Sequence, residues 1–473
     1  MSREATLVAY RAFSDVAGKG AFFLVTVLAA RRLSQSAFGI FSLGTTLGWM
    51  AAVATDAGIQ MHLARRLATI PERAPQLLRT WLRVRLTTSA VALAFAAIVL
   101  LVTRTAGSYA LAVFLFVLAY LISGLIEFLH YFYRGLSRSD IESTLTLWQR
   151  FGTLACAALV LAWRPDVTAL AAAIAFPIVL TFAYSLRRAS QLANAVRWDP
   201  ALAGLNALPS TRSGDARTVA AELRRDVLPI GIGIVLSALY FRIDVVLLQL
   251  WSGTSSVALY NAVFRLVEAL RLFPAAVMAV ALPILCRATS TRPLVGVSAA
   301  LTTFSFAVAA VLWLVADPLV LMVYGDQYAE AVTAFQILVA AFPLMSLNYA
   351  LTHQLIGWNG HRAYAGICAA ALVFNVAINA RLIPAMSIEG AAWATFWTEA
   401  LLTAGCTAAL ARASAALTGI RHSPEAESLR SRPRHGEAVT ASDSRELLRG
   451  VNTPSNGGGG GAPPRKTISG PAT

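Results

Sequence analysis

Apolar segments of about twenty residues follow one another along most of the chain, separated by short polar stretches. A helix needs roughly 20 mostly apolar residues to cross the hydrocarbon core of a bilayer. The pattern predicts such helices near residues 10–30, 37–59, 84–103, 109–131, 145–163 and 168–186, and again near 228–250, 257–284, 294–316, 331–352, 363–382 and 388–411. We therefore expect an all-α polytopic membrane protein with about twelve transmembrane helices.

Two longer polar stretches divide this pattern. We expect a six-helix bundle in 1–186, a cytoplasmic linker in 187–226, a second six-helix bundle in 227–411 and a disordered basic cytoplasmic tail in 412–473. The tail is rich in Arg, Ser and Pro, which is typical of disordered segments. Its arginines favour contact with anionic membrane lipid. A solvated tail without a partner is the simpler alternative.

The composition excludes a soluble protein. Of the 473 residues, 57% are hydrophobic and only 13% are charged, which is too little charge to cover a soluble surface of this size. The net charge of +15 would suggest nucleic acid in a soluble protein. Here the cations lie mostly in loops between apolar segments, so membrane topology explains them and we expect no nucleic-acid partner.

The distribution of arginine predicts the orientation. Loops after even-numbered segments are rich in Arg, whereas loops after odd-numbered segments carry few, and 317–330 is acidic. By the positive-inside rule, the N and C termini and the linker face the cytoplasm. Arg31 and Arg32 are exceptions, for which the sequence offers only snorkelling to the interface.

The two halves resemble each other. Arg65, Thr69 and Pro71 follow the second segment, and Arg287, Thr291 and Pro293 follow the eighth at the same spacing. Six spans separate equivalent positions, so the repeats run in the same direction. Parallel repeats are an architecture of transporters, whose substrate path lies between the halves.

Ionisable residues inside the expected spans are the candidate functional groups. Such a group costs on the order of 2.5–3.5 kcal/mol at the bilayer centre on insertion scales, so it usually faces a bundle interior or a wet cavity. The first half holds Asp15 and Lys19 on one face of the first segment, and Asp56 near the end of the second.

The second half carries more of these charges. Arg242 and Asp244 lie near the middle of the seventh segment, and Arg265, Glu268 and Arg271 are spaced three apart in the eighth. Arg242 and Asp244 point about 200° apart on a helix, so each needs another partner or a wet cavity. Polar pairs inside membranes can also hold helices together, and for any single residue this explanation is as good as transport.

Catalysis and metal binding find little support. The four cysteines, Cys156, Cys286, Cys368 and Cys406, show no CxxC spacing, and no His-rich cluster occurs. No nucleotide-binding, hydrolase or metalloprotease motif stands out. We expect neither an enzyme, nor a metal site, nor a cofactor.

Several motifs together resemble one family. They are Phe241-Arg-Ile-Asp244, Tyr260-Asn-Ala, Pro274 and Leu282-Pro283, then Tyr324 to Ala331, Asn375 to Asn379 with Leu382-Ile-Pro384, Ile388 to Thr395, and the early segment Arg32 to Phe41. In order and spacing they are similar to the Wzx-like polysaccharide and O-antigen flippases of the multidrug/oligosaccharidyl-lipid/polysaccharide (MATE-like) superfamily. The resemblance covers about 1–412.

This resemblance implies a fold and an activity. It implies two six-helix bundles around a central cavity in the bacterial inner membrane, and transfer of an undecaprenyl-diphosphate-linked oligosaccharide to the periplasmic leaflet. A diphosphate crossing hydrocarbon needs fixed positive charge in place of water. Our hypothesis assigns Lys19, Arg242, Arg265 and Arg271 to the diphosphate, and Asp15, Asp56, Asp244 and Glu268 to charge balance or a coupling H⁺ or Na⁺.

Three other functions stay open. A multidrug–cation antiporter of the superfamily is expected to have an apolar or acidic cavity, which the cationic second half argues against. A lipid II flippase of the MurJ kind is expected to have fourteen spans. A scaffold that holds polysaccharide-assembly proteins would explain the tail but not the intramembrane charges.

Overall fold

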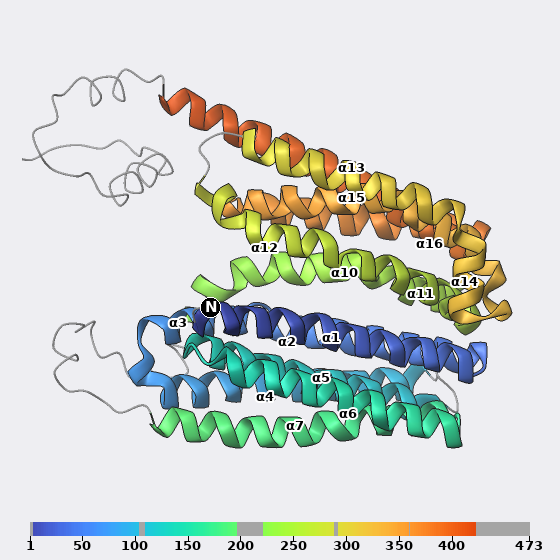
Figure 1. Ribbon diagram of the computed structural model, residues 1–473, viewed down its shortest axis with the longest axis horizontal. Coiled ribbons are helices and arrows are strands. Elements are labelled where there is room, and N and C mark those ends of the chain that lie inside the picture. Colours follow the sequence, from blue (N-terminus) through green and yellow to red (C-terminus); the bar gives the residue numbers. More distant parts are fainter. Residues whose placement is uncertain (1–2, 104–108, 196–220, 288–291, 359, 422–473) are drawn as a thin grey trace, which may run out of the picture. The chain divides into compact units, whose positions relative to one another are not determined.

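The computed structural model of the protein describes residues 3–103, 109–195, 221–287, 292–358 and 360–421. Within these ranges the chain is almost entirely helical. Residues Met1–Ala415 form one compact unit, and the chain from Ala416 onward is a second. All the helix packing described below lies within the first unit, which holds the two bundles that the apolar pattern predicts (Figure 1).

The N-terminal bundle is coloured blue to green in Figure 1. It consists of α1 (Arg3–Arg32), α2 (Gln35–Asp56), α3 (Ile59–Thr69), the 3-10 turn η1 (Pro71–Arg73), α4 (Ala74–Thr103), α5 (Ala110–Gly135), α6 (Ser139–Trp163) and α7 (Val167–Ala195). α5 packs against both α2 and α7, and α1 lies along α6. The core between them is built from small and aromatic side chains such as Ala112, Phe116 and Phe128, which are fully buried.

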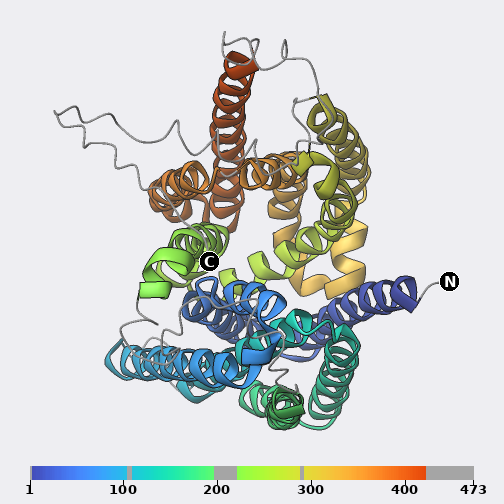
Figure 2. The same ribbon diagram turned by 90° about the vertical axis from the view of Figure 1, so that its left-hand side faces the viewer.

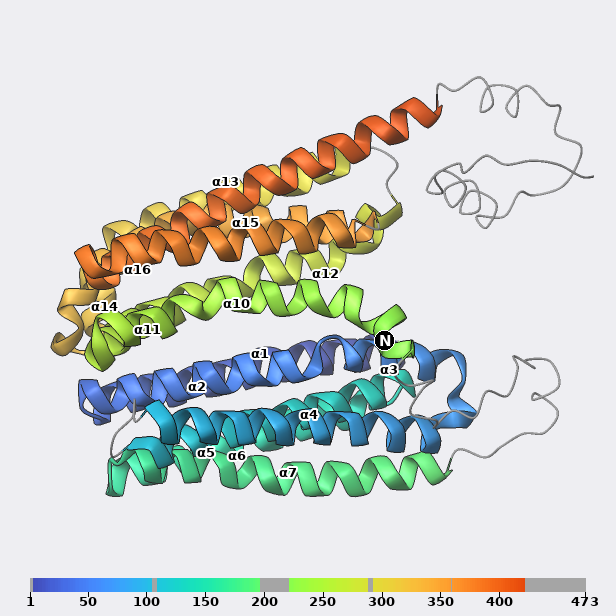
Figure 3. The same cartoon turned by 180° about the vertical axis from the view of Figure 1, so that it is seen from behind.

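The C-terminal bundle begins at the π-helical turn η3 (Leu223–Val227). It continues with α10 (Leu228–Trp251), α11 (Gly253–Leu270), α12 (Leu272–Arg287), α13 (Arg292–Leu314), α14 (Ala316–Tyr324), the 3-10 turn η4 (Asp326–Ala331), α15 (Val332–Gly357) and α16 (His361–Arg421). α15 packs against α11, α12 and α13. Seen from the end in Figure 2 and from behind in Figure 3, these helices form a group of their own beside the first bundle.

Ten helices among the described residues are long and apolar enough to cross a membrane, which makes this a multi-pass membrane protein. The sequence predicts about twelve, and the two counts differ at two places. The expected helices near 363–382 and 388–411 both fall within the stretch His361–Ala415, and the one near 257–284 is divided between α11 and α12. The exact number of crossings stays a prediction.

Local breaks explain those two differences. α11 ends at Leu270, and Pro274 in the first turn of α12 cannot donate a hydrogen bond to continue the preceding helix. α16 changes direction at Ser387, which has a φ of 49°. Here the backbone turns so tightly that a Cβ on Gly390 would lie 2.4 Å from the carbonyl oxygen of Leu382. The two arms of α16 correspond to the two expected helices.

The predicted linker and tail lie largely outside the described residues. α7 continues to Ala195 and η3 begins at Leu223, so the described structure enters the expected linker from both sides. α16 continues to Arg421, past the expected start of the tail at 412. Residues 317–330, expected as an acidic loop, contain the short helix α14 and η4, because apolar residues 318–323 follow Asp317.

The two bundles meet along α2, which contacts both α10 and α11. The approach is close because glycine stands at each crossing. A Cβ on Gly39 would lie 2.0 Å from the carbonyl oxygen of Thr254 on α11, and one on Gly231 of α10 would lie 2.0 Å from that of Ala57. Any larger residue at these positions must push the helices apart.

A second contact joins the bundles at the end that carries α14. The Arg31 Nε of α1 donates to the carbonyl oxygen of Val323 at 2.8 Å, and its guanidinium also donates to that of Met322. Gln327 donates to the carbonyl of Ala30 at 2.8 Å, and Tyr328 does so at 3.3 Å. Arg31 therefore places a cation at the C-terminus of α14, where the helix dipole favours it. This contact supplies the role for Arg31 that its position in the sequence leaves unexplained.

Candidate functional site

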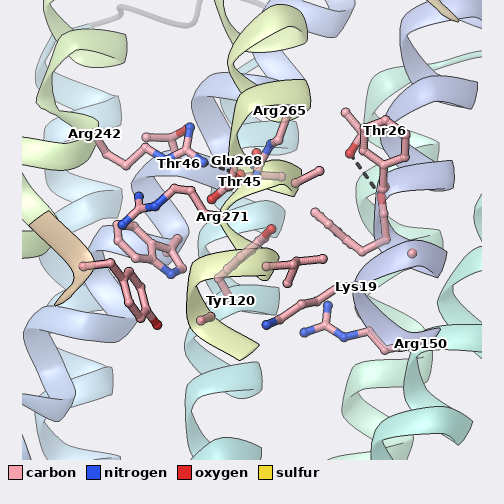
Figure 4. Close-up of a pocket in the computed structure, with 18 residues that line it drawn as sticks. Lys19, Thr26, Thr45, Thr46, Tyr120, Arg150, Arg242, Arg265, Glu268 and Arg271 are labelled. Atoms are coloured by element: carbon pink, nitrogen blue, oxygen red, sulfur yellow. Dashed lines mark hydrogen bonds and ion pairs between the residues drawn. The ribbon is translucent and has the colours of Figure 1, made fainter. Parts of the chain in front are cut away.

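A cavity of about 550 Å³ lies between the two bundles. Its wall is built by α1, α2, α5 and α6 on one side and by α10, α11, α12 and α15 on the other. This size is in the range of small-molecule and headgroup sites in proteins. Figure 4 shows its labelled side chains, which come from both bundles.

The cavity is strongly cationic. Lys19 and Arg150 line it from the N-terminal bundle. From the C-terminal bundle come the charged residues Arg242, Arg265, Glu268 and Arg271. Five cationic side chains and one carboxylate therefore line the wall, which attracts an anion and repels a cation.

Glu268 is shared between two of the arginines. Its Oε2 accepts from Arg242 at 2.8 Å and from Arg265 at 2.7 Å. The Arg242 guanidinium, 3% exposed, also donates to Asn261 Oδ1 at 3.2 Å and lies over the ring of Phe264. One carboxylate can neutralise only one of the two guanidinium charges, so an excess of positive charge stays fixed in the wall.

The other three cations have more freedom. Arg271, at the break between α11 and α12, stacks 4.2 Å above the ring of Phe241. Arg150 lies 5.6 Å from the ring of Phe22. Within the part of the chain that the structure describes, neither they nor Lys19 forms an ion pair within 4.0 Å. Their charges face the cavity with no carboxylate of a described residue within 4.0 Å.

Neutral polar groups complete the wall. Thr45 and Thr46 of α2, Tyr120 of α5 and Tyr349 of α15 line it together with Trp49. Thr46 Oγ1 is buried and forms no hydrogen bond with the described residues. Such groups can donate to phosphate or sugar oxygens that enter the cavity.

The four cations assigned to the diphosphate from the sequence all line this cavity, and so does Glu268. The other three expected acids lie elsewhere. Asp15 is exposed on α1 and is not part of the cavity wall. Asp244 is buried, accepts from the backbone N–H of Val245 at 2.8 Å and accepts from the hydroxyl of Tyr260.

Asp56 lies at the break between α2 and α3. Ala57 and Gly58 there have positive φ values of 41° and 88°. The Asp56 carboxylate accepts from the backbone N–H groups of Gly58 at 3.1 Å and Gln60 at 3.2 Å, and lies 3.9 Å from Arg85 Nε. Its contacts are those of a group that satisfies the first amides of α3.

This geometry predicts how Asp56 responds to substitution. Asp56→Asn keeps a side-chain oxygen for the amides of α3, so we expect near wild-type transport. Asp56→Ala removes that acceptor and also the carboxylate nearest the buried Arg85, so it should cost more than about 1 kcal/mol, which is the cost of a lost helix cap. The thermal midpoint in detergent and the transport rate of both variants check this. Loss of transport in the asparagine variant at a wild-type midpoint would instead favour a role for the charge.

Sequence reasoning missed several buried or cavity-lining charges. Arg150 lies inside the expected span 145–163 and Arg85 inside 84–103, so the rule that singled out Arg242 also applies to them. Arg85 is 1% exposed and donates to Thr55 Oγ1 at 3.0 Å and to the carbonyl of Gly124 at 3.1 Å. Two more are Glu142, 3% exposed in α6, and Glu399, 4% exposed in the second arm of α16.

Comparison with known proteins decides the family. The sequence matches the family described as polysaccharide biosynthesis protein over residues 8–289, more than half of the chain. The chain belongs to the polysaccharide biosynthesis protein family. The match in this family includes all five cations that line the cavity. No curated protein matches the sequence.

Solved structures show the fold of this family member. It is similar to an inward-facing multidrug resistance MATE family transporter of the MOP superfamily, with a TM-score of 0.66, 14% identity, and coverage of 85% of this chain and 96% of that one. The lipid II flippase MurJ in an inward closed conformation gives 0.61 and 9% identity over 87% and 90% of the two chains.

A third similar structure is a MOP superfamily transporter from Pyrococcus furiosus, with a TM-score of 0.55, 13% identity and coverage of 88% and 96%. Its binding pocket is described as having reverse polarity, which suggests a different function for that protein. At these identities the likeness shows a MATE-like fold, as the motifs of the sequence predict. The family match and the fold together show a membrane protein of the polysaccharide biosynthesis protein family with a MATE-like fold.

Proposed function

We propose that the protein is a flippase that moves an undecaprenyl-diphosphate-linked oligosaccharide from the cytoplasmic to the periplasmic leaflet of the bacterial inner membrane by alternating access. The product serves a surface polysaccharide such as O-antigen, the lipopolysaccharide of which it is part, or exopolysaccharide. The termini face the cytoplasm, and membrane lipid and polysaccharide-assembly proteins are the expected neighbours. The single observation that carries this proposal is the cationic cavity between the bundles.

The charge of the cavity suits the headgroup. A diphosphate carries at least two negative charges, and moving it into a wall of low polarity is costly unless fixed cations replace its water. Lys19 and Arg271 have no protein counter-ion within 4.0 Å among the described residues, so they are available to a phosphate oxygen. Arg242 and Arg265 offer the charge that Glu268 leaves uncompensated. Alkyl chains of the prenyl part can remain in lipid.

The roles proposed for the four acidic residues are supported to different degrees. Glu268 balances two guanidinium groups by direct contact. The assignment of Asp15, Asp56 and Asp244 to charge balance or to a coupling H⁺ or Na⁺ is carried by the sequence alone. A multidrug–cation antiporter is disfavoured because the same cavity repels cationic drugs.

The direct test uses purified protein in liposomes. A labelled undecaprenyl-diphosphate oligosaccharide is placed in the inner leaflet, and a membrane-impermeant glycosidase reports its arrival in the outer leaflet. We expect much faster exposure with the protein than in empty liposomes. No exposure, together with efflux of a cationic dye, would overturn the proposal, and no transport of any kind would favour a scaffold.

The lipid II flippase is the second candidate, because its substrate carries the same diphosphate and the MurJ fold is similar. Parallel liposomes with lipid II separate the two. In cells, deletion of the gene is expected to accumulate the lipid-linked intermediate that the protein transports. An intermediate of the peptidoglycan type would replace the oligosaccharide proposal with the lipid II one.

A further inference from the structure

Every described arginine in the cavity wall lies over a phenylalanine ring. Phe22 of α1 itself lines the cavity, and Arg150 Cζ lies 5.6 Å from the centroid of its ring. Arg265 Cζ lies 5.9 Å from the same centroid. Arg150 belongs to the N-terminal bundle and Arg265 to the C-terminal bundle, so one ring contacts cations of both bundles.

A second ring contacts the other two arginines. Arg271 Cζ lies 4.2 Å and Arg242 Cζ 5.3 Å from the centroid of Phe241 on α10. Arg242 also lies 4.5 Å from the ring of Phe264, which meets Phe241 edge to face with the centroids 5.3 Å apart. Phe264 is fully buried in the core and fixes the place of Phe241.

A phenylalanine ring holds a cation without consuming what an anion needs. The face of the ring attracts a guanidinium through its quadrupole, yet the ring is neutral and has no oxygen or nitrogen to accept a hydrogen bond. A carboxylate in the same place would neutralise the charge and occupy N–H donors. Glu268 shows that alternative, because its Oε2 already accepts from Arg242 and Arg265. The rings therefore leave the positive charge and the N–H donors to a ligand.

The rings also lower the entropy cost of binding. An arginine side chain has many rotamers, and ordering such a side chain when a ligand binds costs free energy. A guanidinium that already lies over a ring has fewer positions to lose. Arg150 and Arg271, which have no carboxylate of a described residue within 4.0 Å, gain most from this restraint.

We propose that Phe22 and Phe241 are positioning residues that hold the cavity arginines ready for the headgroup, with their charge and N–H donors free. This inference rests on the proposed function, since the anion that engages the arginines is the substrate diphosphate. It gives Phe241 of the Phe241-Arg-Ile-Asp244 motif a role in substrate binding through Arg242 and Arg271. Phe22 does the same through Arg150 and Arg265.

The experiment replaces each ring by fluorinated phenylalanines and uses inorganic pyrophosphate as the headgroup probe. Fluorine withdraws electrons from the ring face and hardly changes its size, so the attraction for a cation falls while the packing stays. Titration calorimetry of the purified protein gives the dissociation constant of pyrophosphate. We expect it to rise about threefold to tenfold with trifluorophenylalanine at position 22 or 241, and by less with monofluorophenylalanine.

The same series at Phe151 is the matched control. Phe151 follows Arg150 on α6, is half exposed outside the cavity wall, and has no cation of the described chain over its ring. Its variants should bind pyrophosphate as the wild type does. An unchanged or lowered dissociation constant with trifluorophenylalanine at both 22 and 241 would overturn the inference and leave the proposed function standing. Absence of pyrophosphate binding by the wild type would overturn both.

Translocation kinetics in liposomes separate positioning from a merely structural role. Phe22→Leu removes the ring and keeps an apolar side chain, so we expect KM to rise about threefold or more with a smaller change in kcat. Phe22→Tyr keeps a ring over which both arginines can lie and should restore KM to near the wild-type value. Equal KM values for the leucine and tyrosine variants would contradict the inference.

Discussion

Replacing Arg242, Arg265 and Arg271 together by alanine is expected to abolish transport of the lipid-linked substrate. A hydrogen bond to a charged group contributes roughly 1.5–3 kcal/mol, and each 1.4 kcal/mol is a factor of ten. The three residues share one carboxylate and one cavity, so their effects do not simply add. We still expect a decrease of at least about a hundredfold in liposome translocation and loss of complementation in cells.

The design must separate lost binding from lost folding. Removing Arg242 and Arg265 leaves the half-buried carboxylate of Glu268 without its partners, and a partly desolvated carboxylate without a counter-ion destabilises the protein. A second variant therefore adds Glu268→Gln. The matched control replaces three exposed arginines outside the cavity, Arg164, Arg188 and Arg412, by alanine. Wild-type translocation by the neutralised variant, at normal expression and thermal midpoint, would exclude these arginines from substrate binding.

Gly39→Ala is expected to have the second largest effect, because it disturbs the seam between the bundles. The seam consists of the contacts of α2 with α10 and α11 and of the contacts that α1 and α2 make with α14 and η4. The added Cβ would lie 2.0 Å from the carbonyl oxygen and 2.9 Å from the carbonyl carbon of Thr254, and both atoms belong to backbone that cannot move aside alone. α2 and α11 must separate, which also weakens the contacts of α1 with α14 and η4. We expect strongly reduced transport and a lowered thermal midpoint.

The control for Gly39→Ala is expected to change the stability of the protein in the opposite direction. Alanine favours a helix over glycine by about 1 kcal/mol, so Gly366→Ala in α16, where nothing lies within 4 Å of the added Cβ, should be neutral or stabilising. Cysteines introduced as Gln35→Cys and Gln327→Cys report the seam, because these residues are hydrogen-bonded across it at 3.3 Å. Equal cross-linking with Gly39→Ala and Gly366→Ala would show that the seam tolerates the methyl group.

Hydrophobic patterning predicted the helices well because each span must place about twenty consecutive apolar residues either in the protein core or against lipid. It even separated the two arms of α16, since Pro384 and the polar residues near Ser387 interrupt the apolar run. It missed α14, because the apolar stretch 318–323 is much shorter than a membrane span and lies between Asp317 and Asp326.

The candidate site was predictable in part. A charge inside a span reveals its depth along the helix, and all four expected cations do line the cavity. Which of these charges reach the cavity is set by tertiary packing, which no single sequence shows. Asp15 and Lys19 share one face of α1 and both are exposed, but only Lys19, one turn further along the helix, lines the cavity. The position of Asp56 depends on a positive φ at Ala57, which alanine does not signal.

The bonds that Arg31 donates to α14 end on main-chain oxygens rather than side chains. Every residue type supplies such an oxygen, so mutations at Met322 and Val323 leave the acceptors in place. Evolution can then alter the outer surface of α14 freely while this attachment persists. Among related sequences, we expect arginine to be kept at position 31 while the residue types at 322 and 323 vary. Substitutions at 322 and 323 should therefore show no covariation with position 31.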